Sequence, residues 1–328
     1  MPTSQFTIYS STDVGGPGYL NGRTGSLITV LDACLVNGYS GKPSAGWSKP
    51  FATTSSVSTY KQGSGSRFTV LINDSGPNAT PLGKEAWATG WEYLSASTAP
   101  VGTGSGQFPL PAQLLTTGHT VIRKSASADS VLRPWVLYAD ASTFYLFVVT
   151  GDSSGYYMFM FGDIYSLSGS SDLYRCMIIG RQIEDNGASQ YADLLNPYMT
   201  ATNLLGHFIA RTAGGGGAGS TVVSKIADMS KEVGNVNSTY VIGVGSIPCP
   251  NPTDNAIYIG PIWIVENSAY LRGRLRGMYC ACHAVSNFAD GQCFQGSNQY
   301  AGKSFKVVKP SETSGMFVME TSATVETN

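Results

Sequence analysis

The spacing of apolar residues near the start of the chain predicts one helix. Thr24 or Ser26 is the expected N-cap, because a short side-chain oxygen can accept a hydrogen bond from a free amide of the first turn. Gly38 is expected to end the helix, since glycine readily adopts the left-handed conformation found there. The sequence therefore predicts a helix over about 24–37 that docks on the rest of the protein, because so short a helix is marginal alone. Its apolar face follows the i, i+4, i+7, i+8 spacing and consists of Leu27, Leu31, Cys34 and Leu35.

Runs of β-branched and aromatic residues dominate the chain after this helix and are typical of strands. Residues 135–139 and 144–149 are separated by a short polar segment, 140–143, which predicts a hairpin. Residues 134–183 as a whole predict an antiparallel meander whose strands are apolar on both faces, so that both faces are covered. The predicted fold class is therefore mainly β, with an antiparallel meander, a sandwich or barrel-like architecture and one N-terminal helix.

Glycine-rich segments punctuate this pattern and indicate how the chain is organised. Residues 95–107 and residues 213–220 are both expected to be loops, and the second is a low-complexity tract typical of a flexible loop or linker. A single compact unit is the alternative to a division into regions. The regions would be an N-terminal β-rich part at 1–125 that contains the helix, the meander at 126–212, the loop at 213–220 and a C-terminal β-rich part at 221–328.

The composition favours a protein that shares its surface with neighbours. Only 12% of the 328 residues are charged, against about 25% in a typical soluble domain. The 39 glycines also exceed the usual share of about 7%. The net charge of −1 gives no bulk attraction to nucleic acid. The first residues predict no secretory leader, and no apolar run is long enough to predict a membrane span.

The sequence offers no recognisable catalytic constellation. It contains three histidines, and neither a Gly-x-Ser-x-Gly elbow nor a His-Glu-x-x-His helix is present. Acidic residues are scattered, and nothing in their spacing selects the facing pair that a glycosidase needs. The glycine-rich tract at 213–220 lacks the Lys-Ser/Thr of a phosphate-binding loop. These features predict a protein that is not an enzyme and uses no cofactor.

A late cluster of sulfur and imidazole side chains leaves three alternatives open. Cys280, Cys282, His283 and Cys293 are potential soft metal ligands, but their spacing matches no strong zinc motif. A disulfide within or between subunits is the second alternative. Buried free thiols are the third and the default, because no secretory leader places the chain in an oxidising compartment.

Three arginines alternate with smaller residues and are expected to share one face of a strand. Arg272, Arg274 and Arg276 would then lie roughly 7 Å apart along that face. Such a stripe could be the solvated face of an edge strand or bind carboxylates of a neighbouring subunit. Phosphates of a nucleic acid are the third alternative, which the near-zero net charge disfavours.

The glycine- and proline-rich segment after the helix carries two aromatic residues of interest. Trp47 and Phe51 are expected either to tuck against the body of the protein or to form a partner-binding loop. The 18 tyrosines and 5 tryptophans of the chain could also stack on sugar rings. Tyrosine-rich strands are nevertheless more often sheet core or subunit contact.

Several segments together resemble a family of tailed-bacteriophage virion structural proteins, which are tail-associated or decorate the capsid. They occur in the expected order and span most of the chain. The segments are GSLITVLDACLVNGY at 25–39, AGWSKPF at 45–51, RPW at 133–135, FYLF at 144–147, YLRGRLRGMY at 270–279, DG at 290–291 and AGKSF at 301–305.

This resemblance implies a non-enzymatic virion component assembled in the host cytoplasm, in contact with other virion proteins and with copies of itself. The resemblance favours the tail side, at the collar, tail tip or baseplate periphery. A capsid decoration protein and a module that binds host surface glycans are the alternatives. The resemblance carries over no catalytic residue and no cofactor, and it implies neither a membrane nor a nucleic-acid partner.

Overall fold

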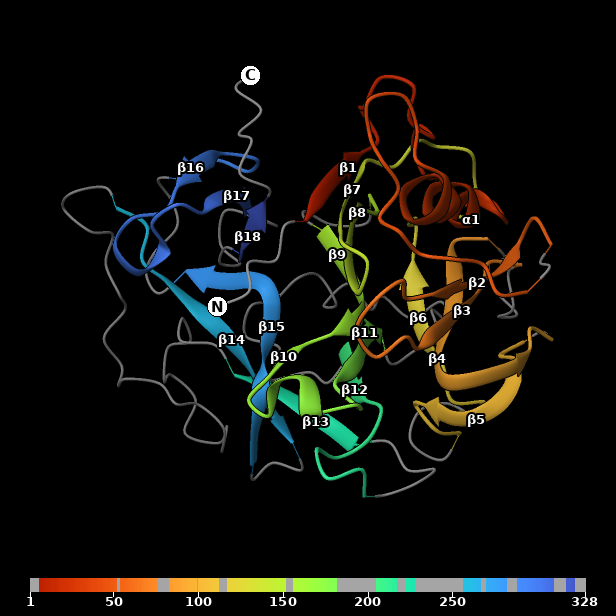
Figure 1. Ribbon diagram of the computed structural model, residues 1–328. Helices are drawn as coiled ribbons and strands as arrows, with labels where there is room; N and C mark the ends of the chain where they lie inside the picture. Colours follow the sequence, from red (N-terminus) through yellow and green to blue (C-terminus); the bar gives the residue numbers. More distant parts are fainter. Residues whose placement is uncertain are drawn as a thin grey trace, which may run out of the picture.

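The protein is mainly β, as a computed structural model shows. Antiparallel strands curl into a half-barrel, and one α-helix lies near the N-terminus of the described part (Figure 1). This confirms the predicted fold class. The structure describes residues 6–51, 54–75, 83–98, 100–111, 117–151, 156–181, 205–216, 222–227, 256–266, 270–281, 288–309 and 317–321.

The elements follow one another as short strands, with helical turns at three places. The helical elements are α1 (Ser26–Leu31), the π-helix η1 (Asp32–Asn37) and the 3-10 turns η2 (Gly169–Ser171) and η3 (Asn298–Tyr300). The first strands are β1 (Thr7–Ser10), β2 (Val57–Lys61), β3 (Thr69–Asn73), β4 (Glu85–Ala96), β5 (Thr103–Phe108), β6 (Thr120–Arg123), β7 (Trp135–Ala139), β8 (Thr143–Val149) and β9 (Tyr156–Asp163). The others are β10 (Tyr165–Ser166), β11 (Cys176–Arg181), β12 (Leu205–Ile209), β13 (Val222–Ala227), β14 (Ile259–Glu266), β15 (Tyr270–Ala281), β16 (Cys293–Gln295), β17 (Ser304–Val308) and β18 (Phe317–Thr321).

The predicted helix exists and ends where its sequence predicts. Helix α1 continues directly into the π-helix η1, so helical backbone runs over 26–37. Gly38 ends it with a φ of 72°, a left-handed value that glycine adopts at no steric cost. The predicted apolar face is buried in the main core, and it comprises Leu27, Leu31, Cys34 and Leu35.

The predicted N-cap is wrong, because a distant carboxylate takes the place of a local hydroxyl group. Gly25 occupies the cap position, with no side-chain hydrogen bond from the cap itself. The backbone amide of Leu27 instead donates to Asp74 Oδ2 at 2.9 Å, and Asp74 follows strand β3. The hydroxyl of Ser26 points elsewhere and donates to the carbonyl of Asn21 at 2.9 Å. A buried anion at the amino end of a helix supplies the same stabilisation as a local cap.

The predicted meander forms and separates two cores. Strands β7, β8, β9 and β11 pair antiparallel in this order. Side chains alternate between the faces of a strand, so Phe144 and Leu146 of β8 join the core that contains helix α1. Tyr145 and Phe147 join the second core, which contains residues of β14, β15 and β18. Each large apolar side chain buried in this way contributes about 1.5–3 kcal/mol.

The first core extends across the boundary predicted at 125/126, and the second core extends across the boundaries at 125/126 and 212/213. The first core contains residues from Tyr9 to Ala210, and the second contains residues from Phe6 to Met319. Strands β14, β15 and β18 lie on one side of the meander, and α1 with β2–β4 lies on the other (Figure 1). The regions proposed from the sequence therefore share cores within the described part of the chain.

One predicted loop contains a strand. Residues 103–107, expected to belong to a loop over 95–107, form most of β5 and pair with β4. The glycines in this segment permit a close approach, because a Cβ on Gly104 would lie 2.1 Å from the carbonyl oxygen of Tyr93. Gly106 has a φ of 67°, which a residue with a side chain rarely adopts. The prediction of a loop is therefore wrong for residues 103–107, because the glycines here allow two strands to pack tightly.

The described residues contain no helix that is both long and apolar enough to cross a bilayer.

Candidate functional site

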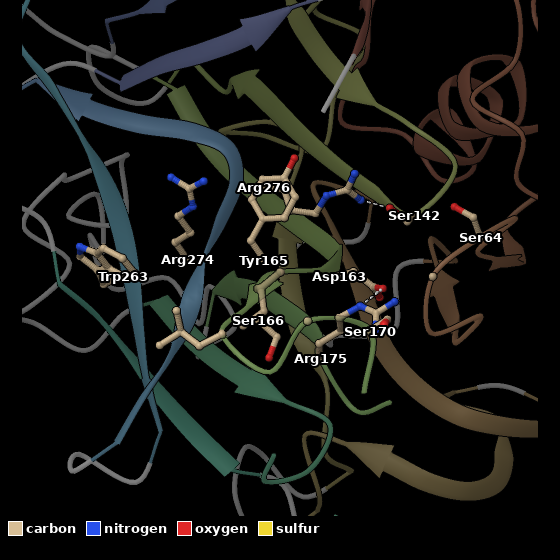
Figure 2. Close-up of a pocket in the computed structure, with 14 residues that line it drawn as sticks. Ser64, Ser142, Asp163, Tyr165, Ser166, Ser170, Arg175, Trp263, Arg274 and Arg276 are labelled. Carbon is tan, nitrogen blue, oxygen red and sulfur yellow. Dashed lines mark hydrogen bonds and ion pairs between the residues drawn. The ribbon is translucent and has the colours of Figure 1, made fainter. Parts of the chain in front are cut away.

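A pocket of about 640 Å³ opens beside strands β10, β14 and β15 (Figure 2). This volume lies in the range of pockets that bind small molecules, roughly 300–1,000 Å³. Its lining combines arginines, aromatic rings and hydroxyl groups. The side chains labelled in Figure 2 are Ser64, Ser142, Asp163, Tyr165, Ser166, Ser170, Arg175, Trp263, Arg274 and Arg276.

Strand pairing places an aromatic residue on each side of one arginine. Arg274 of β15 is the cross-strand partner of Trp263 in β14. On the other edge of β15 its partner is Tyr165 of β10. Directly opposed residues project from the same face of a sheet, about 4.5–5.5 Å apart. The sheet therefore presents a row of tryptophan, arginine and tyrosine toward the pocket.

The other face of these strands belongs to the second core. Ile262 and Ile264 of β14 and Leu275 of β15 are buried there. Met278 also faces that core, although it lies three positions after Leu275. The alternation of side chains along β15 shifts by one position at Gly277. Its φ of 60° fits a β-bulge, and the register between β14 and β15 is irregular here. The bulge keeps Leu275 and Met278 packed in the core, while Arg274 and Arg276 line the pocket.

Arg276 reaches across the pocket wall to the turn between β7 and β8. Its Nη2 donates to Asp140 Oδ2 at 2.7 Å, and its Nη1 contacts the hydroxyl of Ser142. The guanidinium carbons of Arg274 and Arg276 lie 5.4 and 5.3 Å from the centroid of the Tyr165 ring. The electron-rich face of the ring offsets the repulsion between the two cations. Asp140 also accepts bonds from the turn amides, which agrees with its predicted turn position.

Asp163 is the one carboxylate among the described residues that line the pocket, and its oxygens are occupied. Its Oδ1 accepts a hydrogen bond from the side-chain amide of Gln62 at 2.8 Å. Its Oδ2 accepts from the backbone amide of Ser66 at 3.0 Å and from Arg175 Nε at 2.9 Å. These bonds make Asp163 a support for the pocket wall and orient Arg175 along it.

The structure separates Arg272 from the other two arginines of the predicted stripe. Its guanidinium is buried and makes two bonds to Asp172, at 2.7 and 2.8 Å, and a third contact with Glu266. Strand β15 is not an edge strand, because it pairs with β14 on one side and with β10 and β18 on the other. The interpretation as a solvated edge is therefore corrected. Arg274 and Arg276 do share one face and line the pocket.

The two aromatic residues of the glycine-rich segment belong to the body of the protein. Trp47 is buried, its Nε1 donates to the carbonyl of Asp140 at 2.7 Å, and its ring packs edge-on against Phe144. This burial agrees with the first of the two alternatives, in which Trp47 tucks against the body of the protein. Phe51 is half-buried against a small cluster that includes Trp91. Both side chains therefore fit the alternative in which this segment packs against the body of the protein.

The cysteine cluster supports neither a disulfide nor a metal site within the described residues. The thiol of Cys280 is buried and lies 3.6 Å from the carbonyl oxygen of Gly260. Cys293 is free and exposed. Cys282 and His283 lie outside the described residues. No group of three or more potential ligands is placed to hold a metal ion in the part that is described.

His119 is held neutral, which gives a stability prediction. Its ring stacks on Trp87 with centroids 3.7 Å apart, and burial lowers its pKa to about 3. Between pH 6.5 and 3 the unfolded chain therefore binds a proton that the folded protein does not. The free energy of unfolding should fall as the pH falls through this window, by about 1.4 kcal/mol per unit. A His119→Phe variant keeps the stacking and should lose this slope in denaturant titrations at several pH values. Equal slopes for the two proteins would contradict the assignment.

A scan against models of protein families and a search of curated proteins each found no match to the chain. The chemistry of the pocket follows from its own side chains. Guanidinium groups bind carboxylate, sulfate or phosphate oxygens with charge-assisted hydrogen bonds. Aromatic rings pack on flat ligand faces, and serine hydroxyls both donate and accept. The pocket is therefore suited to a ligand that combines an anionic group with a ring and hydroxyl groups.

Sequence reasoning found Arg274 and Arg276 but missed their aromatic neighbours. The pairing of Trp263 with Arg274 could have been found, because consecutive strands on either side of a short connection usually pair. Tyr165 had no comparable signal, since β10 is only two residues long and reaches β15 from a distant part of the chain. Arg175 had no such signal either, because its place in the pocket lining depends on its bond to Asp163.

Proposed function

We propose that the chain is a non-enzymatic structural component of a tailed-phage virion, located at the collar, tail tip or baseplate periphery. The resemblance of the segments at 25–51, 133–147 and 270–305 supports the virion setting, and it alone favours the tail over a capsid decoration role. The low charge of the chain also fits a protein whose surface is shared with neighbours. Its partners are other virion proteins and copies of itself.

An apolar patch at one end of β15 is the observation that carries the contact role. The patch consists of Leu167, Leu173, Tyr270 and Leu271, all of which are exposed. The backbone amide of Leu167 donates to the carbonyl of Arg272, and Leu173 follows Asp172, to which Arg272 is bound. The backbone segments that carry the four side chains therefore meet near the buried Arg272 ion pair. Grouped exposed apolar side chains mark contact sites more often than single ones do.

Mass spectrometry of purified particles tests the virion assignment. The proposal predicts this polypeptide in intact virions, and in the tail fraction after heads and tails are separated. Detection in the head fraction alone would favour the capsid decoration alternative. Absence from purified particles would overturn the proposal.

A variant of the apolar patch should lose incorporation without losing stability. Placing carboxylates at Leu167 and Leu173 would force charges into a contact that the proposal makes apolar. Replacement of central contact residues weakens binding by about 2 kcal/mol or more, so incorporation should fall at least roughly tenfold. The Leu167→Glu/Leu173→Glu variant would be compared with Val14→Glu, another exposed apolar position.

The free energy of unfolding of the isolated patch variant should lie within about 0.5 kcal/mol of the wild-type value, because surface substitutions rarely change it by more. Quantitative immunoblots of particles from complementation measure incorporation. Equal incorporation of the patch variant and of Val14→Glu would exclude the patch as the contact.

A host glycan-binding module is the second candidate, and the pocket favours it. Trp263 and Tyr165 line the pocket together with arginines and serines, a combination that suits sugar rings and their hydroxyl groups. The two candidates are compatible, since a tail component can carry a receptor pocket. Binding of sugars by the isolated chain would support the second candidate independently of the first.

A further inference from the structure

Three features of the pocket together favour one class of ligand. The first is the row of Trp263, Arg274 and Tyr165, which strand pairing places side by side on one face. Arg274 is partly exposed at the centre of this row. Figure 2 shows its guanidinium between the Trp263 and Tyr165 side chains. The guanidinium carbon of Arg274 lies 5.4 Å from the centroid of the Tyr165 ring, and this cation–π contact restrains its orientation.

The second feature is the sign of the charge. The lining includes Arg175, Arg274 and Arg276 against the single carboxylate of Asp163 among its described residues. Asp140, outside the lining, balances Arg276 through a bond of 2.7 Å. With both carboxylates counted, these five groups still carry one net positive charge. The charge favours an anion over a cation, and in a concave site it acts at short range.

The third feature is a set of hydroxyl groups around this charge. Ser64, Ser142, Ser166 and Ser170 line the pocket, and they come from three segments of the chain: the connection between β2 and β3, the turn between β7 and β8, and residues 166–170. Hydroxyl groups that converge from several directions can bond the ring hydroxyls of a sugar as donors or acceptors.

We infer that this pocket binds an acidic saccharide. The carboxylate, or an equivalent anionic group, binds Arg274 beside Arg276. The sugar ring packs on Trp263, and its hydroxyls bond to the serines. This inference deepens the glycan-binding candidate and rests on it, and it does not depend on where the chain lies in a virion. A sulfate or phosphate on the sugar would present similar oxygens to the guanidinium, so the test separates the three groups.

Titration calorimetry with the isolated chain tests the inference. The probes are glucuronic acid and N-acetylneuraminic acid as carboxylates, glucose 6-sulfate, glucose 6-phosphate, and glucose and galactose as neutral controls. At least one acidic sugar should bind at millimolar concentration or below, at least roughly tenfold more tightly than the neutral sugars, as expected for a charge-assisted hydrogen bond. Binding should weaken as the salt concentration rises.

Two variants locate the binding in the pocket. Arg274→Gln should weaken binding of the acidic sugar roughly tenfold or more, and Trp263→Leu should weaken acidic and neutral sugars alike. Arg23→Gln is the matched control, because Arg23 is exposed and lies outside the pocket lining. Thermal unfolding of each variant verifies that it is folded.

The outcomes separate this inference from the proposed function. Equal affinity for acidic and neutral sugars would overturn the acidic preference and leave a neutral glycan site. An equal loss in Arg274→Gln and Arg23→Gln would overturn the pocket as the site. No binding of any sugar at millimolar concentration would overturn the glycan candidate as well. The virion assignment would then still be decided by the composition of purified particles.

Discussion

Replacing Arg272 by methionine is expected to lower the free energy of unfolding by about 3–5 kcal/mol, the usual cost of removing one partner from a buried ion pair. The guanidinium of Arg272 is buried and bonds Asp172 twice, and it also contacts Glu266. The substitution would leave both carboxylates buried without the cation that neutralises them. Methionine fills a similar volume and is flexible, so loss of packing adds little. Urea denaturation monitored by tryptophan fluorescence measures the change.

Arg274→Met is the matched control for this prediction. Arg274 lies two residues further along the same strand, but it is partly exposed in the pocket wall. Its replacement should cost less than about 1 kcal/mol, as for most partly solvated charges. Similar losses for the two variants would show that the environments of Arg272 and Arg274 do not differ as the structure describes.

Replacing Asp74 by alanine is the second large effect, with an expected loss of about 3–5 kcal/mol. The side chains of Asp74 and Lys124 form an ion pair and are fully buried. Asp74 also accepts the bond from the Leu27 amide that caps helix α1. Lys124 Nζ donates to the carbonyl of Arg23 at 2.7 Å, which holds the loop before the helix. Loss of Asp74 would therefore leave a buried ammonium and remove the cap together.

The pair of Lys49 and Asp32 provides the comparison at a partly exposed site. These side chains lie 2.9 Å apart and are about a quarter exposed, so Lys49→Met should cost no more than about 1 kcal/mol. Burial raises the pKa of Asp74 to about 6. Both variants should therefore be compared at about pH 8, where the carboxylate is ionised. A loss below 1 kcal/mol for Asp74→Ala would show that the pair does not hold the helix start.

The elements that could be predicted from the sequence are those fixed by nearby residues. The apolar face of the helix and its end at Gly38 depend on spacing within 12 residues, the length of α1 and η1 together. The hairpin of β7 and β8 depends on Asp140, whose Oδ1 accepts the amides of Ser142 and Thr143 within the turn. Local hydrogen bonds of this kind leave a signature in sequence. The cap from Asp74 leaves none, because Asp74 follows strand β3 and lies 47 positions from Leu27 in the sequence.

The candidate site was only partly visible in the sequence for the same reason. Alternation along β15 placed Arg274 and Arg276 on one face, which the pocket confirms. Alternation could not reveal that Arg272 is buried, since its partners Asp172 and Glu266 come from outside the strand. The pocket itself depends on tertiary pairing, because Tyr165 reaches β15 through β10. Periodicity identifies a face, whereas the packing of distant segments decides what covers it.

In the proposed function the protein is a scaffold with two binding surfaces. The apolar patch around Arg272 would face neighbouring subunits, and the pocket around Arg274 would face a ligand. The two surfaces adjoin at Leu167, which belongs to the patch and also lines the pocket. Both lie along β15, so a subunit docked on the patch would hold the pocket in a fixed position on the particle. The carboxylate in the pocket wall, Asp163, is bonded to Gln62, Ser66 and Arg175 and acts in this account as a structural support.

A reconstruction of the purified phage particle at side-chain resolution tests the proposed function most directly. The account predicts this chain on the tail, with Leu167, Leu173 and Tyr270 packed against a neighbouring subunit and the Arg274 pocket open to solvent. A particle that lacks the chain would contradict the account, and so would one in which the patch faces solvent in every copy.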